Sequence, residues 1–353
     1  MLKTMNRLLS KLLLLVLATS LCGCHNEANV THRGVYYWRT TFNLSKQEQQ
    51  FLQDHQIDRL YLRLFDIDVA QQNLWTPSCP QPIATILFPN NDDINKQLQS
   101  VNECIPTVFI TQEALRMMEN NEDTYARKIC TRVLNMCSYH GFDEKVHEIQ
   151  LDCDWTANTQ DSYFKLLDSL RMLLKEKGIQ LSATIRLHQL RTAAPPVDRG
   201  ALMIYNTGSF RHIETKNSIL TYEQAATYLK NYDYPLELDY AFPTFQWGMW
   251  FRDNKFMAIL HCSDYSDPTL YQQQDSTHFV VLKSHANDGH WLAKGDVIRY
   301  ETSDVSTIED VKSLLQFPNG ETNTLILYHL DENNLNKFTD HEIETLYTRI
   351  VAE

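Results

Sequence analysis

Two carboxylates separated by one residue stand out in the segment Leu151-Asp152-Cys153-Asp154-Trp155-Thr156. Alternate side chains of a strand point to the same side, so Asp152 and Asp154 would share one face. Two neighbouring carboxylates repel, and such a pair can divide the roles of acid and base between its members. The alternative is that Arg63 or Arg186 neutralises both carboxylates, so that the pair only stabilises the fold. The residues alone leave both interpretations open.

Other polar and aromatic side chains stand where apolar, strand-like runs end. They are Trp38 and Arg39, Arg63 and Asp66, Thr111, Arg186 and His188, Tyr205 and Asn206, Asp239 and Tyr240, and His329 and Asp331. Burying so many ionisable groups without a function would be costly. A cleft for a polyhydroxylated ligand would account for them, because flat rings such as those of Trp155 and Trp247 stack on sugar faces. The alternative for each single ring is a place in the core.

The elements that must position these groups are strands alternating with helices. Strands are predicted over 35–40, 59–65, 105–110, 148–153, 181–187, 201–205, 236–242 and 325–330, with a further apolar run over 83–88. Helices are predicted over 45–55, 123–139, 159–177, 221–231, 305–315 and 340–351. This alternation indicates parallel pairing. Eight units predict a (β/α)8 TIM-like barrel with an aromatic-rich insertion over about 243–300, after the seventh strand. A doubly wound open sheet is the alternative, but no Gly-rich first turn supports it.

Local signals support several of these bounds. Ser45 with Glu48, and Thr339 with Glu342, have the spacing of capping boxes. Gly141 is placed to end the helix over 123–139. A disulfide between Cys79 and Cys104 is left open, because spacing alone cannot decide pairing.

Three short motifs, in chain order, resemble those of chitinase-like glycoside hydrolases. Asp152-Cys153-Asp154-Trp155 resembles their fourth-strand signature DxxDxDxE, and Met203-Ile204-Tyr205-Asn206 resembles their sixth-strand Met-x-Tyr-Asp. Leu238–Gly248, with its proline and aromatics, is similar to their seventh strand. The layout also resembles Bacteroidota lipoproteins that carry such barrels. The resemblance implies a TIM-like barrel that binds glycan at the carboxyl ends of its strands.

The sequence departs from this family at three acidic positions. Thr156 stands where the family has its acidic Glu, Ile149 where it has the leading Asp, and Asn206 where the sixth strand has Asp. A threonine cannot protonate a glycosidic oxygen near neutral pH. Hydrolysis would therefore need other acids, with Asp154 as the candidate acid, Asp152 as its electrostatic partner and Asp239 as a further carboxylate. The substrate-binding candidates are Trp155, Arg63, Arg186, Tyr205, Asn206, Tyr240, Trp247, His329 and Asp331.

The first residues have the pattern of a bacterial lipoprotein signal. Lys3, Arg7 and Lys11 precede and interrupt an apolar run that ends in Leu21-Cys22-Gly23-Cys24. The run is too short for a stable membrane-spanning helix, and small residues precede the cysteine. We expect removal of residues 1–23, a lipid on Cys24, a tether over 24–33 and a single barrel domain over 34–353. We expect the protein in the cell envelope, with its lipid inserted in a bacterial membrane. The outer membrane is the first candidate.

The charge balance narrows the range of partners. Loss of residues 1–23, which hold three basic and no acidic residues, would change the formal charge from −12 to −15. Phosphate backbones repel such a domain, so nucleic acid is not expected as a partner. No cofactor or metal is predicted, although a metal on the loop from His285 to His290 stays an alternative. The oligomeric state is left open.

Three functions remain at this point. The leading interpretation is an envelope lipoprotein whose barrel binds glycan and, as a divergent glycoside hydrolase, also cleaves it. The alternative is a non-catalytic glycan-binding or scaffolding lipoprotein that has lost the catalytic acid. A weaker third reading is an envelope assembly protein without a ligand.

Overall fold

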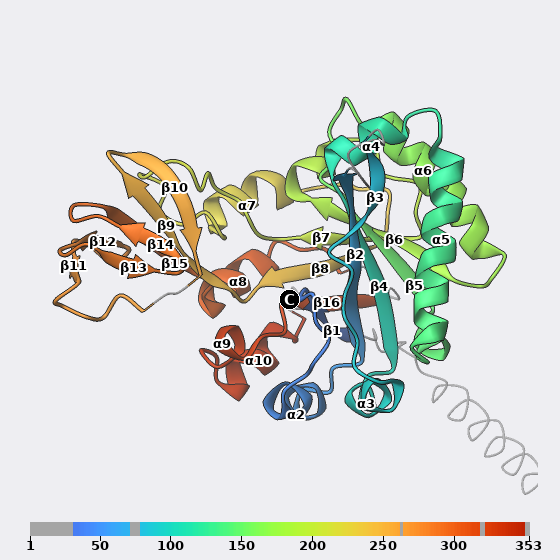
Figure 1. The fold of residues 1–353 in the computed structure, drawn as a ribbon, viewed down its shortest axis with the longest axis horizontal. Helices are drawn as coiled ribbons and strands as arrows, with labels where there is room; N and C mark the ends of the chain where they lie inside the picture. Colours follow the sequence, from blue (N-terminus) through green and yellow to red (C-terminus); the bar gives the residue numbers. More distant parts are fainter. Residues whose placement is uncertain (1–30, 71–77, 262–263, 318–321, 350–353) are drawn as a thin grey trace, which may run out of the picture.

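A closed barrel of eight parallel strands forms the centre of the molecule. The computed structural model describes residues 31–70, 78–261, 264–317 and 322–349, so the predicted leader and Cys24 lie outside it. Strand β1 pairs in parallel with both β16 and β2, which closes the sheet and rules out the open-sheet alternative. The predicted (β/α)8 fold is therefore confirmed (Figure 1). The barrel strands are β1 (Thr31–Tyr37), β2 (Arg59–Ala70), β4 (Glu103–Ile110), β5 (Glu148–Asp152), β6 (Gln180–Arg186), β7 (Arg199–Met203), β8 (Leu238–Pro243) and β16 (Asn323–Tyr328).

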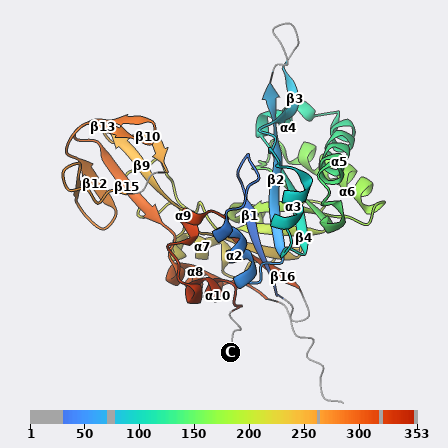
Figure 2. The same cartoon turned by 60° about the horizontal axis from the view of Figure 1, so that its bottom comes forward.

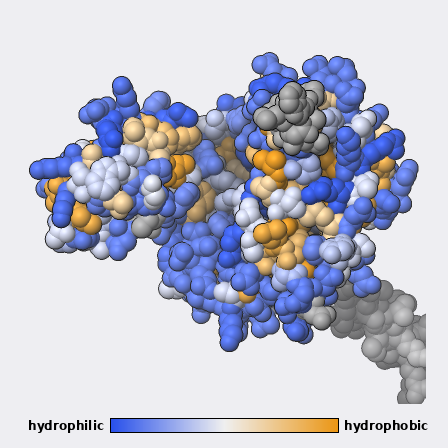
Figure 3. Space-filling model, viewed as in Figure 1, coloured by the Kyte–Doolittle hydropathy of each residue, from blue (hydrophilic) through white to orange (hydrophobic). Residues whose placement is uncertain are grey.

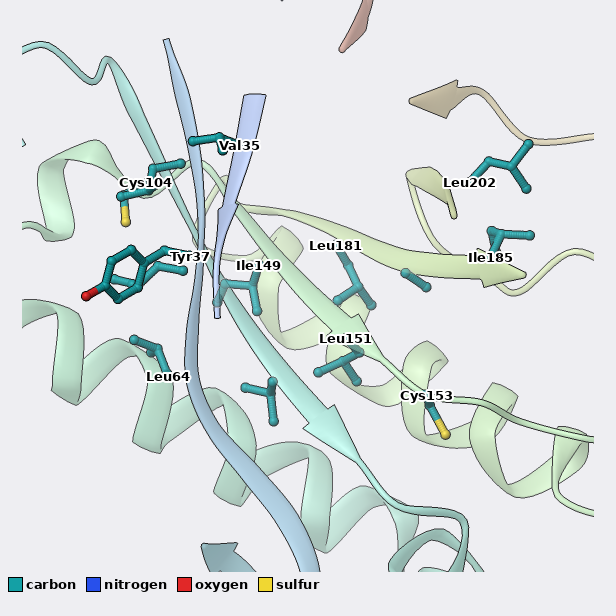
Figure 4. Packing of buried hydrophobic residues seen from close by; sticks show 14 of the residues in the cluster. Val35, Tyr37, Leu64, Cys104, Ile149, Leu151, Cys153, Leu181, Ile185 and Leu202 are labelled. Carbon is teal, nitrogen blue, oxygen red and sulfur yellow. The ribbon is translucent and has the colours of Figure 1, made fainter. Parts of the chain in front are cut away.

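Apolar side chains fill both sides of the barrel wall. Outward-facing residues such as Val35, Ile149, Leu151 and Leu181 pack in one large core beneath the helices (Figure 4). A smaller cluster, which includes Tyr36, Tyr61, Ile105, Met203 and Ile326, is separate from that core. Strands buried on both faces carry near-continuous apolar runs, and this explains their sequence pattern.

Helices cover the barrel, and their caps follow the sequence. They are α2 (Lys46–Asp54), α3 (Asn91–Gln97), α4 (Gln112–Met118), α5 (Glu122–Tyr139), α6 (Gln160–Lys175), α7 (Tyr222–Leu229), α8 (Val305–Lys312), α9 (Glu332–Leu335) and α10 (Asp340–Leu346). Both predicted capping boxes, at Ser45 and Thr339, are formed. Gly141 follows α5 with a φ of +73°, which glycine adopts at low cost. Between β6 and β7 the chain forms only the 3-10 helix η2 (Leu187–Arg191).

The structure decides two local features that the sequence left open. The apolar run over 83–88 is not a strand of its own. The strand at this place is β3 (Cys79–Ile83), which pairs antiparallel with β2. Cys79 and Cys104 are free thiols, so the disulfide that the sequence left open is not formed.

In the described part of the chain, no helix has the length and apolarity needed to cross a membrane.

The insertion after the seventh barrel strand is a lobe of antiparallel strands. Its five-stranded sheet has the order β10-β9-β15-β12-β11, and β13 and β14 form a separate hairpin. Trp250, Leu260, Tyr265 and Ile298 belong to a core of its own. The lobe lies to one side of the barrel (Figures 1 and 2). Its strands are β9 (Gln246–Arg252), β10 (Lys255–Leu260), β11 (Tyr271–Gln273), β12 (His278–Val281), β13 (His285–Asn287), β14 (His290–Leu292) and β15 (Val297–Thr302).

Candidate functional site

A cleft of about 880 Å³ lies where the barrel strands end at their carboxyl termini. One of its walls belongs to the insertion, and the surface is hollowed between this lobe and the barrel (Figure 3). Active groups of such barrels come from the ends of several strands, and this cleft follows that rule. Its lining residues are Trp38, Asp66, Phe109, Asp152, Arg186, Met203, Tyr205, Asn206, Phe245, Gln246, Trp247, His261, Asp264, Tyr328, His329, Asp331, Asn333 and Asn334.

The two predicted carboxylates share one partner. Arg186, the last residue of β6, donates from Nη2 to Oδ1 of Asp152 at 2.9 Å and from Nε to Oδ1 of Asp154 at 2.5 Å. Burial disfavours the charge of Arg186, but the two carboxylates outweigh it and raise the pKa of the guanidinium. Arg63 instead pairs with Asp66. Both acids therefore pair with Arg186, which is the neutralisation that the sequence left open as the alternative.

Asp152 and Asp154 differ in their surroundings. Asp152 lines the cleft with a side chain only 7% exposed, and its Oδ1 also accepts a hydrogen bond of 2.6 Å from Thr184. The side chain of Asp154 is 57% exposed and does not line the cleft. Thr156, which is exposed, is also absent from the lining. Of Asp152, Asp154 and Thr156, only Asp152 lines the cleft.

Aromatic rings gather around Tyr328, the last residue of β16. The ring centroids of Tyr205, Phe245 and Trp38 lie 5.3, 5.9 and 6.0 Å from that of Tyr328. Trp247 extends the group, with its ring centroid 4.9 Å from that of Phe245 and its Nε1 bonded to Glu301 at 2.7 Å. These five rings, which we call the aromatic floor, come from both the barrel and the insertion. They provide the kind of flat apolar surface on which sugar rings stack.

The loop after β16 supplies polar groups to the cleft. Burial lowers the pKa of His329, and its Nδ1 is buried without a partner in the described part of the protein. Asp331 caps α9, and its Oδ1 accepts hydrogen bonds of 3.0 and 3.4 Å from the backbone amides of Asn333 and Asn334. On the insertion side, hydrogen bonds from Ser266 lower the pKa of Asp264.

The structure brings together about half of the residues that the sequence nominated. Seven of the predicted catalytic and binding residues line the cleft, namely Asp152, Arg186, Tyr205, Asn206, Trp247, His329 and Asp331. Trp38 and Asp66, which stand at predicted strand ends, also line it. Arg63 is not part of the lining, but it contacts two lining residues, Asp66 through an ion pair and Trp38 through its ring and carbonyl.

Two of the predicted aromatic site residues lie outside the cleft. Trp155 points outward and packs against Tyr163 and Phe164 of α6, because side chains alternate and Asp152 takes the inward position. Tyr240 also faces the helices, and its hydroxyl donates to the carbonyl of Gln316 at 2.6 Å. Trp155 and Tyr240 are therefore core residues and not part of the cleft.

The prediction that Asp239 lies at the carboxyl end of a barrel strand is wrong. Asp239 is the second residue of β8, near the amino end of the strand, where it pairs with Arg199 at 2.9 Å. Glu148, the first residue of β5, belongs to the same buried group, and burial together with Asp239 raises its pKa to about 7. This cluster is at the opposite end of the strands from the cleft, so Asp239 cannot work together with Asp152.

Sequence reasoning missed several lining residues. Phe109, Met203, Gln246, His261, Asp264, Tyr328, Asn333 and Asn334 were not nominated. A signal existed for Tyr328, because it comes directly before His329 at the end of the last barrel strand. None existed for His261 or Asp264, whose position depends on how the insertion folds back over the barrel. Among the described residues, no group of three or more His, Cys, Asp or Glu side chains is arranged to hold a metal ion.

Solved structures with the same fold come from chitinase-like proteins. A chitinase from Chromobacterium violaceum is 12% identical, with a TM-score of 0.53, over 90% of this chain and 98% of its own. The spore cortex-lytic enzyme SleL of Bacillus cereus is 14% identical, with a TM-score of 0.52, over 91% and 76%. A chitinase-like agglutinin from Robinia pseudoacacia is 12% identical, with a TM-score of 0.50, over 89% and 98%.

These similarities define the class of fold, which is that of the chitinase-like glycoside hydrolase barrels. The identities are too low to define more than the fold. No protein-family model matches the sequence, and no curated protein matches it.

Proposed function

We propose that this chain is a glycan-binding protein of the bacterial cell envelope that has kept the cleft of a glycoside hydrolase barrel but does not cleave its ligand. The observation that carries this proposal is the state of the carboxylates in the cleft. Each of them is already hydrogen-bonded to neighbouring groups of the protein, and the position of the family's acid is occupied by the exposed Thr156.

Hydrolysis of a glycosidic bond requires a carboxylic acid that carries a proton and reaches the leaving oxygen. Asp66 is bound through both oxygens by Arg63, and Asp152 is bound by Arg186 and Thr184. Asp331 accepts two backbone amides, and Asp264 accepts from Ser266. Each of these four carboxylates is therefore engaged through at least one oxygen by a neighbouring group of the protein. The cleft thus offers poor candidates for the proton donor.

Binding of sugar, in contrast, fits the lining well. The aromatic floor provides stacking surfaces, and the amides of Asn206, Asn333 and Asn334 can both donate and accept hydrogen bonds. Two of the neighbours with the same fold are named as a chitinase and as an agglutinin, which are a glycan-cleaving and a glycan-binding class. A barrel of this class can therefore serve either role, and the carboxylates favour the second.

The proposed place of action is the cell envelope. The leader pattern before Cys24 is that of a bacterial lipoprotein, similar to the Bacteroidota lipoproteins with such barrels. A lipid on Cys24 would hold the acidic domain at a membrane that its charge alone would not attract. The simplest test is metabolic labelling with a fatty acid in cells that express the full chain or Cys24→Ser. The proposal requires label on the native chain only.

The binding proposal is tested by a glycan array followed by an assay of turnover. We expect the chain to bind a subset of glycans and to release no reducing ends from them during long incubation. Trp247→Ala should weaken binding, whereas Trp291→Ala should not, because Trp291 lies on the β13–β14 hairpin outside the cleft. Release of reducing ends by the native chain that is lost in Asp152→Asn would overturn the proposal and make the chain a hydrolase.

A further inference from the structure

The cleft carries an excess of negative charge. Four carboxylates line it, from Asp66, Asp152, Asp264 and Asp331, against the single guanidinium of Arg186. Of the two histidines in the lining, His329 has a lowered pKa because it is buried, so it adds no positive charge near neutral pH. Asp154 at the rim shares Arg186 with Asp152, which leaves two carboxylates for one cation at this point.

Cations behind the lining cancel only part of this charge. Arg63 neutralises Asp66, which leaves Asp152, Asp264 and Asp331 against Arg186. Arg39, which faces Asp331, donates to both oxygens of Glu48 at 2.8 Å. Lys337 donates to the carbonyl of Phe245 and to Thr302, and burial lowers its pKa to about 8. None of these three cations belongs to the cleft lining.

Two of the carboxylates each use only one oxygen in the hydrogen bonds described above, so the other oxygen is available to a ligand. Asp152 uses Oδ1 for both Thr184 and Arg186, and Asp331 uses Oδ1 for both backbone amides of α9. The second oxygen of each has no hydrogen-bond donor within the described ranges of the chain. The two residues stand on opposite sides of the mouth, because β5 and β16 are four strands apart in the closed order. A ligand lying across the mouth could therefore meet both.

We infer that the cleft selects glycans whose amino sugars carry free ammonium groups rather than acetamido groups, an inference that rests on the proposed function. An ammonium has three donors and no acceptor, which matches carboxylate oxygens that lack a donor. Its charge-assisted hydrogen bonds are stronger than those of a neutral amide or hydroxyl. Anionic sugars would meet repulsion from the same carboxylates.

The test compares two oligosaccharides of equal length, a glucosamine hexamer and an N-acetylglucosamine hexamer, by calorimetry with the mature chain. The pH is slightly acidic, so that the sugar amines are protonated. We expect the glucosamine hexamer to bind at least about tenfold more tightly at low salt, a difference of about 1.4 kcal/mol. High salt should reduce this preference, because ion pairs at an open cleft are screened.

Asp331→Asn provides the sharpest variant. Asparagine caps helices as well as aspartate does, so the start of α9 should be retained while one charge is lost. The preference for the glucosamine hexamer should fall by about threefold or more, because one charge-assisted hydrogen bond to the ammonium is weakened. Asp168→Asn, an exposed change on α6 away from the cleft, is the matched control and should leave the preference unchanged.

The outcomes separate the two proposals. Equal affinities, or tighter binding of the acetylated hexamer, would overturn the inference and leave glycan binding in place. Tighter binding of an anionic polymer such as polygalacturonate would also overturn it. Binding of no glycan, either here or on the array, would remove both the inference and the function on which it rests.

Discussion

Arg186 at the end of β6 donates a hydrogen bond of 2.9 Å from Nη2 to Oδ1 of Asp152 on the neighbouring strand β5. The contact joins two strand ends at the floor of the cleft, where the Asp152 side chain is only 7% exposed. A buried carboxylate without such a partner would be strongly unfavourable, because burial removes its hydration. Arg186 is therefore required both for the charge balance of the cleft and for the local fold.

Removal of Arg186 should destabilise the protein. Arg186→Met leaves Asp152 buried without its cation, and we expect a loss of about 3–5 kcal/mol in the free energy of unfolding. Urea denaturation measures this loss. Arg171→Met is the matched control, since its pair with Asp198 is more exposed and should contribute at most about 1 kcal/mol. Equal effects of the two changes would contradict the assigned role of Arg186.

Trp155 and Tyr328 should respond to substitution in opposite ways. Trp155 is 2% exposed and packs on α6, so Trp155→Ala should cost about 3–5 kcal/mol of stability and leave glycan affinity unchanged in the folded fraction. Tyr328 stands at the centre of the aromatic floor, and Tyr328→Ala should reduce affinity by about tenfold or more. Binding titrations below the unfolding temperature of both variants measure this. Weakened binding in Trp155→Ala would show that the ring is part of the site.

The buried Glu148 should make stability depend on pH. Its pKa rises from 4.5 to about 7, so between these values the folded state keeps a proton that the unfolded state has released. Stability must then fall as the pH rises through this window. Glu148→Gln removes this dependence. The free energy of unfolding of the variant, measured relative to that of the native chain, should therefore be up to about 3 kcal/mol larger at about pH 8 than at about pH 4.

Urea titrations at the two pH values test this expectation. Glu144→Gln, an exposed change in the 3-10 helix η1 (Asp143–Lys145), serves as the control and should shift stability equally at both. A difference between Glu148→Gln and the native chain that does not change with pH would contradict the raised pKa.

The insertion should depend on a buried ion pair. Arg299 Nε donates to Glu301 Oε1 at 2.7 Å, and neither side chain is exposed. Glu301→Ala would leave the guanidinium unpaired and remove the acceptor of Trp247, so amide exchange in β9 and β15 should rise and glycan affinity should fall. The double change Arg299→Met with Glu301→Met should recover most of the lost protection, because apolar pairs can replace buried ion pairs.

The sequence predicted the barrel because strand and helix periods alternate along nearly all of the chain. It was less successful with the site, since the direction of a side chain depends on register. Asp152 and Trp155 are three positions apart, so the alternation rule itself places their side chains on opposite sides of an extended chain. Asp239 was misplaced because strand bounds shift by a few residues. His261 could not be found, because its place depends on contacts between the insertion and the barrel.

Closure of the barrel by β1 has a consequence for the order of folding. Thr31 of β1 lies opposite Asn323 of β16, so the first and last strands of the ring are distant in sequence. During synthesis, β1 and β2 can pair early, but the free edges of the unfinished sheet stay available until β16 has emerged. Open edges and late, non-local pairing slow folding and favour association between chains. The nascent chain therefore carries open strand edges for most of its synthesis.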